Sequence, residues 1–153
     1  MKTCFFIGHR DAPQELLPQI ESAVERMVIS EGVTHFLVGH YGNFDRMAAE
    51  AVIRTKKRHR SVMLHMLLPY RTASRMEHLP EGFNGVFCPF DTAPAETAAI
   101  PVANKYAISH CDHLIAWSCH EGNARGFVEY ALSWGKIAVI NLADQQEISA
   151  PDQ

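Results

Sequence analysis

Residues that could bind a ligand gather just after four apolar runs of the chain. Each segment combines glycine or proline with histidine, arginine, asparagine or acidic residues. Glycine lets the backbone approach a ligand closely. Free amides at a helix N-terminus attract anions such as phosphate. The segments are residues 8–11, 39–45, 69–71 and 118–126.

Two of these segments, residues 39–45 and 122–126, lead from a glycine into a predicted helix. Their amides should face a phosphate, with Arg10 or Arg125 beside them. The alternative is a plain tight turn with a helix cap. Likewise, Asp45 either caps its helix or binds a ribose hydroxyl, and His9 and His40 either stabilise loops or exchange protons. The candidate ligand-binding residues are Gly8, His9, Arg10, Gly39, His40, Tyr41, Gly42, Asn43, Asp45, Tyr70, Gly122, Asn123, Ala124 and Arg125.

The elements that position these residues are predicted from apolar periodicity. Strands are expected near residues 3–7, 34–38, 61–68, 86–88, 113–118 and 137–142, and amphipathic helices lie between most of them. The first helix should have Pro13 in its first turn, and another helix should span residues 123–134. The strands are nearly continuous apolar runs, which suits burial on both faces. The sequence therefore predicts a three-layer α/β/α Rossmann-like domain with a mostly parallel sheet of five to six strands. In such a sheet all the strand-to-helix loops meet at one edge.

Bulk properties limit the classes of partner. The chain has 153 residues, a net charge of −3 and 47% hydrophobic residues. We expect one domain over residues 1–145 and a polar tail over 146–153. The net charge argues against a general nucleic-acid surface or an anionic membrane. No leader or membrane span is apparent, and the four cysteines lack CxxC spacing, which suits reduced thiols in the cytoplasm. A homo-oligomer remains open.

Three further patterns point away from common sites. The densest histidine cluster, residues 110–113, falls at the opposite edge of the sheet and lacks paired zinc-ligand spacing, so no metal is predicted. The basic run 56–60 is interpreted as a solvated helix end rather than a nucleic-acid patch. Neither GxGxxG after the first strand nor a P-loop is present, which excludes conventional dehydrogenases and P-loop NTPases. No cofactor is expected.

Several motifs resemble a known family. CFFIGHR (4–10), GVTHFLVGHYGNFD (32–45), LLPY (67–70) and SHCDHLIAW (109–117) are similar to the YpsA-like branch of the SLOG superfamily. That superfamily includes the LOG-type nucleoside-monophosphate phosphoribohydrolases and the DNA-processing protein DprA. The resemblance runs from about residue 4 to 142. It implies a Rossmann-like fold with a nucleotide-like ligand above one edge of the sheet.

The enzymatic relatives carry a GGxGTxxE signature, in which the glycines hold phosphate and the glutamate acts in glycosidic cleavage. The matching stretch here keeps Gly122 and Glu129 but departs at Asn123, Arg125 and Gly126. This departure favours a module that binds or senses a small phosphate-bearing ligand, with a nucleotide or nucleotide derivative as the first candidate. The alternative is hydrolysis of a nucleotide N-glycosidic bond, with Glu129 as the catalytic residue.

Overall fold

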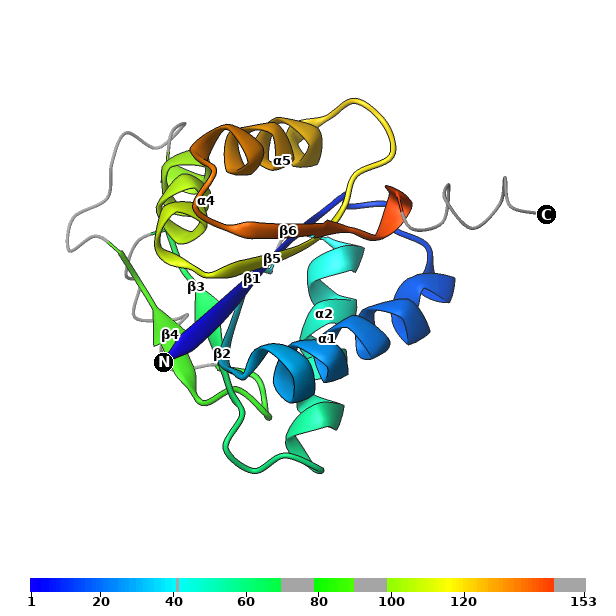
Figure 1. Cartoon of the computed structure of the whole chain (residues 1–153), viewed down its shortest axis with the longest axis vertical. Coiled ribbons are helices and arrows are strands. Elements are labelled where there is room, and N and C mark those ends of the chain that lie inside the picture. Colours follow the sequence, from blue (N-terminus) through cyan, green and yellow to red (C-terminus); the bar gives the residue numbers. More distant parts are fainter. Residues whose placement is uncertain (41, 70–78, 90–98, 145–153) are drawn as a thin grey trace.

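The computed structural model describes residues 1–40, 42–69, 79–89 and 99–144. Within these ranges, six parallel strands form one sheet in the order β4-β3-β2-β1-β5-β6. Figure 1 shows the sheet with helices on either side. The predicted α/β class and parallel sheet are confirmed. The strands are β1 (Lys2–Gly8), β2 (Val33–Val38), β3 (Met63–Leu67), β4 (Gly85–Phe87), β5 (His113–Trp117) and β6 (Ala138–Asn141).

Helices cover both faces of the sheet. One hydrophobic cluster packs between the sheet and α1 and α2, and a second packs between the sheet and α4 and α5. All residues of β5 are buried, as a continuous apolar strand between two helix layers requires. The helices are η1 (Gln14–Leu16), α1 (Leu17–Glu31), α2 (Asn43–Lys56), α4 (Ala99–His110) and α5 (Asn123–Trp134).

The winding of the chain reverses at β1. From β1 the chain passes through α1 to β2 on one side, whereas β5 pairs with β1 on the other side and leads into α5. The pairing aligns Gly8 of β1 with Trp117 of β5, so the loops that follow these two strands begin side by side at the carboxyl edge of the sheet. In open α/β sheets, ligands bind in the crevice at this switch point, beyond the carboxyl ends of the strands.

The start of the first helix differs from the prediction. Pro13, which we expected in the first helical turn, instead precedes the short 3-10 helix η1. The α-helix begins at Leu17 and has Pro18 in its first turn, where a missing N–H costs no hydrogen bond. It ends at Gly32, whose φ of 71° is the left-handed conformation that glycine adopts readily.

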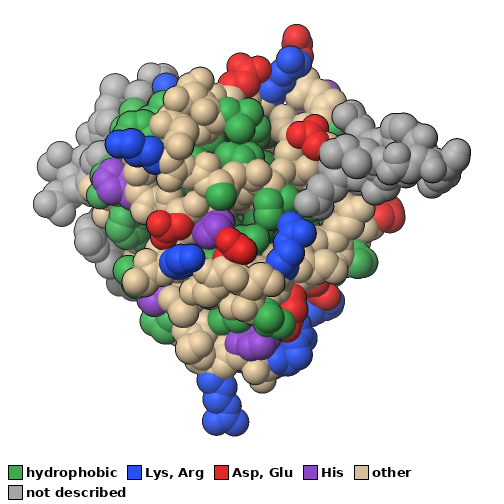
Figure 2. All heavy atoms as spheres, viewed as in Figure 1, with side chains coloured by type: hydrophobic (Ala, Val, Ile, Leu, Met, Phe, Trp, Pro, Cys, Tyr) green, Lys and Arg blue, Asp and Glu red, His purple; other side chains and the backbone are tan. Residues whose placement is uncertain are grey.

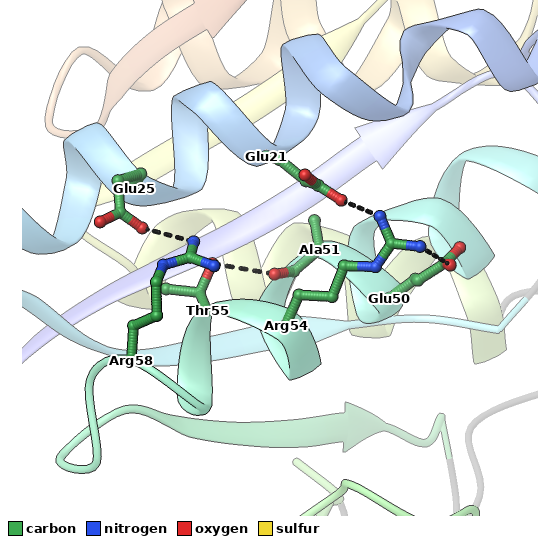
Figure 3. Close-up of polar contacts among 7 residues, drawn as sticks. All are labelled: Glu21, Glu25, Glu50, Ala51, Arg54, Thr55 and Arg58. Atoms are coloured by element: carbon green, nitrogen blue, oxygen red, sulfur yellow. Dashed lines mark hydrogen bonds and ion pairs between the residues drawn. The ribbon is translucent and has the colours of Figure 1, made fainter.

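Ion pairs join α1 to α2 and to the turn that follows α2, as Figure 3 shows. Arg54 contacts Glu21 of α1 and Glu50 of its own helix, and Arg58 contacts Glu25 at 2.8 Å. The predicted basic helix end therefore lies against carboxylates of the neighbouring helix. Exposed pairs of this kind contribute about 0–1 kcal/mol each, so apolar packing remains the main source of stability.

The basic run extends beyond the end of α2, which includes only its first residue. The helix stops at Lys56, so residues 57–60 lie beyond it in a turn in which the Arg58 N–H donates to the Thr55 carbonyl at 3.0 Å. Lys56 itself donates to the Gly82 carbonyl at 2.7 Å and to Asn84 Oδ1 at 2.6 Å. These contacts tie the end of α2 to the segment before β4.

Three predictions concern the chain as a whole. Residues 146–153, the expected polar tail, lie outside the described residues. Among the described residues, no helix is both long and apolar enough to cross a membrane. All four cysteines are free thiols, and burial raises the pKa of Cys111 to about 11.

Candidate functional site

Three loops interlock at the carboxyl edge of the sheet. The Asn43 amide donates to the Arg10 carbonyl at 3.0 Å, which joins the loop after β2 to the loop after β1. The Cys119 amide donates to His9 Nε2 at 3.2 Å, which joins the loop after β5 to the same loop. Segments distant in sequence thus form one surface at the predicted edge.

A cleft of about 220 Å³ opens beside this surface, on the face of the sheet that α4 and α5 cover. Its floor is the end of β1, and its sides come from α4, the first turn of α5 and the start of α2. It lies where the switch-point rule places a ligand. The lining residues are Phe5, Phe6, Ile7, Gly8, Arg10, Gly39, Asp45, Ile100, Asn104, Asn123, Ala124 and Phe127.

The first turn of α5 offers free donors to this cleft. Gly122 precedes the helix, and no side chain caps it. The amides of Asn123 and Ala124 make no hydrogen bond to another described residue. Helix-end amides carry partial positive charge, and Arg10 lines the same cleft. The combination is suited to an anionic oxygen.

Asn104 is a buried polar residue in the wall of the cleft. It is only 7% exposed, and its side chain makes no hydrogen bond to another described residue. Ile100 of α4 and Phe127 of α5 flank the same space. Because the residue lines the open cleft, its amide donor and acceptor are available to a ligand. The sequence patterns did not single out Asn104, because one amide in a helix of mixed composition does not show which face it occupies.

His9 lies beside the cleft rather than in it. Its ring is only 5% exposed, stacks on His120 with the ring centroids 3.6 Å apart, and meets the Trp117 ring edge-on. Because Nε2 accepts the Cys119 N–H, that nitrogen is unprotonated and the imidazole is neutral. Burial and then the neighbouring His120 lower the pKa of His9, and Asp11 opposes this effect. The ring also approaches Gly122, where a Cβ would lie 3.7 Å from Nδ1.

The predicted residues divide into two groups around the cleft. The residues that line it are Gly8, Arg10, Gly39, Asp45, Asn123 and Ala124. Gly42, Asn43, His9 and Gly122 belong instead to the loop contacts that shape its edge. Because the Asn43 amide already bonds to Arg10, it is used within the fold, contrary to the expectation that it faces a phosphate.

Some predicted residues lie elsewhere. Arg125 and Glu129 pair with each other one helical turn apart, Nε to Oε1 at 3.2 Å, and neither lines the cleft. The Glu129 side chain is 66% exposed. His40 is half-buried and does not line the cleft. Tyr41 and Tyr70 lie outside the described residues.

A second hollow of about 360 Å³ lies nearer the amino ends of the strands, on the same face of the sheet. His35 and His65 stack across β2 and β3 within it, with their ring centroids 6.3 Å apart. Burial, followed by His35 and Lys56, lowers the pKa of His65. The lining is mainly apolar and lacks a helix N-terminus, so it does not have the donor arrangement of the first cleft.

Comparison with known proteins bears on the fold of this cleft-bearing domain. No family model matches the sequence, and no curated protein matches it. The chain shares its fold with DNA processing protein A. The solved structure of that protein, from Helicobacter pylori, superposes with a TM-score of 0.61 at 16% identity. The match covers 90% of this chain and 64% of that chain, so this chain spans less than two thirds of the compared protein.

This likeness confirms the Rossmann-like α/β fold that the sequence predicts. Membership of the SLOG superfamily and of its YpsA-like branch stays a prediction. The structure of DNA processing protein A concerns its binding of single-stranded DNA. The expectation of no general nucleic-acid surface, which we based on a net charge of −3, is contradicted by this neighbour, because a protein of the same fold binds single-stranded DNA. Net charge sums the whole surface, whereas binding depends on charge at the site.

Figure 2 shows that acidic and basic side chains are interspersed over one face of the molecule, with histidine among them. The net charge of the chain therefore does not describe the charge at a particular site. Positive potential at the cleft comes from Arg10 and from the start of α5, not from the average composition. The site must therefore be judged from its local donors.

Proposed function

We propose that the cleft between β1, α4 and α5 binds one nucleotide unit. The observation that carries the proposal is the Asn104 amide, unpaired among the described residues, in the same cleft as the free first-turn amides of α5. A ligand that satisfies both must carry an anionic group as well as further hydrogen-bonding groups. A nucleotide has this arrangement.

The residues that line the cleft support one arrangement of the phosphate, base and ribose of the ligand. The phosphate lies against the amides of Asn123 and Ala124, with Arg10 beside it. The apolar side chains of Ile100 and Phe127 contact the flat base, and Asn104 hydrogen-bonds to its edge. Asp45, at the start of α2, is placed to accept a ribose hydroxyl.

The size of the cleft limits the ligand. At about 220 Å³ it is smaller than the roughly 300–1,000 Å³ pockets that enclose drug-sized molecules, so it would hold a mononucleotide only in part and leave most of a dinucleotide outside. A free mononucleotide and one nucleotide of a single strand present the same groups to these walls. Because a protein of the same fold binds single-stranded DNA, the test must include a short single strand as well as free nucleotides.

We propose binding or sensing rather than hydrolysis. A group that assists glycosidic cleavage must lie against the ribose, whereas Glu129 pairs with Arg125 and does not line the cleft. The departures from the GGxGTxxE signature point in the same direction.

The test is a thermal-shift and calorimetric screen with inorganic phosphate, the nucleoside monophosphates and a short oligothymidylate. A ligand at 100 times its Kd should add about 2.7 kcal/mol to the free energy of unfolding. Asn104→Asp keeps the size but replaces the donor with a carboxylate, so it should abolish the gain. Lys105→Ala, on the exposed side of the same helix, is the matched control. Equal binding by the Asn104→Asp variant and the parent would refute the proposed site.

A further inference from the structure

A second cluster of ligand-type side chains lies beside the cleft. His9, Cys119 and His120 each place one ligand atom so that all three atoms lie within 4.8 Å of one another. His9 is buried, while Cys119 and His120 are exposed on the loop before α5. This mixture of imidazole and thiol groups differs from the amides and arginine that line the cleft.

The fold brings these residues together through strand pairing. Gly8 is aligned with Trp117 in the β1–β5 ladder, so the residues that immediately follow both strands meet. His9 and Cys119 are 110 positions apart in sequence. No sequence spacing could reveal the cluster, and this is why a metal site was not predicted from histidine and cysteine spacing.

We propose that His9, Cys119 and His120 bind a zinc ion. Imidazole nitrogen and thiolate sulfur are the ligands that zinc prefers, whereas magnesium and calcium require oxygen. On binding, the Cys119 thiol releases its proton to solvent and the thiolate sulfur coordinates the metal. Three protein ligands also match the zinc sites that keep a fourth position open.

His120 already has the tautomer that a ligand needs. Its Nδ1 lies 2.7 Å from the Glu121 carbonyl, to which it donates, so Nε2 carries the free lone pair. Zinc-binding histidines commonly make this second hydrogen bond to a carbonyl or carboxylate. Asp11 Oδ1 lies 3.5 Å from the same Nε2 and is the nearest candidate for the fourth position.

Binding requires a small rearrangement. The two imidazole rings are parallel, 13° apart, so their lone pairs lie side by side rather than converging. The His120 side chain is half-exposed and can turn away from its stack on His9 while its Nδ1 keeps the Glu121 carbonyl, whereas His9 is held against Trp117. If His9 binds through Nε2, the metal replaces the Cys119 N–H as partner of that nitrogen.

The experiment uses Zn²⁺ and Co²⁺ alone with the full chain. Co²⁺ bound by a thiolate gives a sulfur-to-metal charge-transfer band, which reports on cysteine directly. We expect this band in the parent and its loss in Cys119→Ser. We also expect the Zn²⁺ affinity of His120→Asn to fall by more than the roughly 10–100-fold loss that follows removal of an outer hydrogen-bond partner.

Matched controls use residues of the same type away from the cluster. Cys88→Ser and His110→Asn should keep both the band and the parental Zn²⁺ affinity. Circular dichroism confirms that each variant is folded. A Co²⁺ complex of the parent without the band, or equal Zn²⁺ affinity in the parent and Cys119→Ser, would overturn the proposal. Because no nucleotide is present, this result is independent of the proposed cleft function.

Discussion

Gly42 and Arg10 are packed so closely that a Cβ on Gly42 would lie 2.6 Å from the Cα of Arg10. The adjoining Asn43 amide donates to the Arg10 carbonyl. The loop after β2 is thus fixed against the loop after β1 by backbone contact. Since Arg10 lines the cleft, this contact sets the position of the only Lys or Arg among the described residues that line it.

Gly42→Ala should therefore disturb both stability and ligand binding. The added methyl meets backbone, which cannot yield as a flexible side chain does, and overpacking of this kind costs about 1–3 kcal/mol. Urea denaturation measures the loss. Gly126→Ala is the control, because a Cβ there meets nothing within 4 Å and alanine favours a helix by about 0.5–1 kcal/mol. A Gly42→Ala variant as stable as the parent would contradict the close contact.

Asn104→Leu should separate stability from function. Leucine has nearly the shape of asparagine and removes an amide that makes no hydrogen bond to another described residue, so the free energy of unfolding should not fall. The same change removes the group proposed to bind the base, so nucleotide affinity should fall. Denaturant unfolding and calorimetry measure the two effects. A loss of stability in this variant would show that the Asn104 amide supports the fold.

Acid should weaken the protein partly through His65. Its pKa is lowered in the folded state by burial, by His35 and by Lys56, so the unfolded chain takes up a proton at a higher pH than the folded one. The contribution of this histidine to stability is therefore complete above about pH 6.5 and declines as the pH falls toward the lowered value. His65→Gln should flatten the pH dependence in that window. An unchanged slope in the variant would show that His65 does not titrate differently on folding.

Glu129→Gln should leave nucleotide binding within about twofold of the parent, because Glu129 pairs with Arg125 outside the cleft. Incubation of both proteins with nucleoside monophosphates should release no free base. Base release by the parent and its loss by about 10²–10⁴-fold in the variant would instead support the hydrolase hypothesis.

Local patterns predicted the elements well where their signals lie close together in sequence. α5 occupies residues 123–134 as expected, because Gly122 precedes it and Gly135 ends it with a φ of 73°. Pro13 was misplaced because Pro18 offered a second acceptable start, and only packing decides between them. The parallel sheet followed from continuous apolar runs such as β5.

The site was only partly predictable, because some of its residues come together from positions far apart in the sequence. The shared edge of the sheet follows from topology, so Gly8, Arg10 and Asn123 could be grouped in advance. The role of Asn104 depends on which face of α4 meets the cleft, and the His9 cluster depends on the pairing of β1 with β5. Both are long-range relationships that a single sequence does not contain.

The most direct test of the nucleotide site is an amide chemical-shift titration of the ¹⁵N-labelled chain with a nucleoside monophosphate. The largest shifts should fall on the Asn123 and Ala124 amides and the Asn104 side chain, and should saturate together. Inorganic phosphate should move the first two but not Asn104. No shifts up to about 1 mM ligand, or shifts centred on the hollow around His35 and His65, would contradict the account.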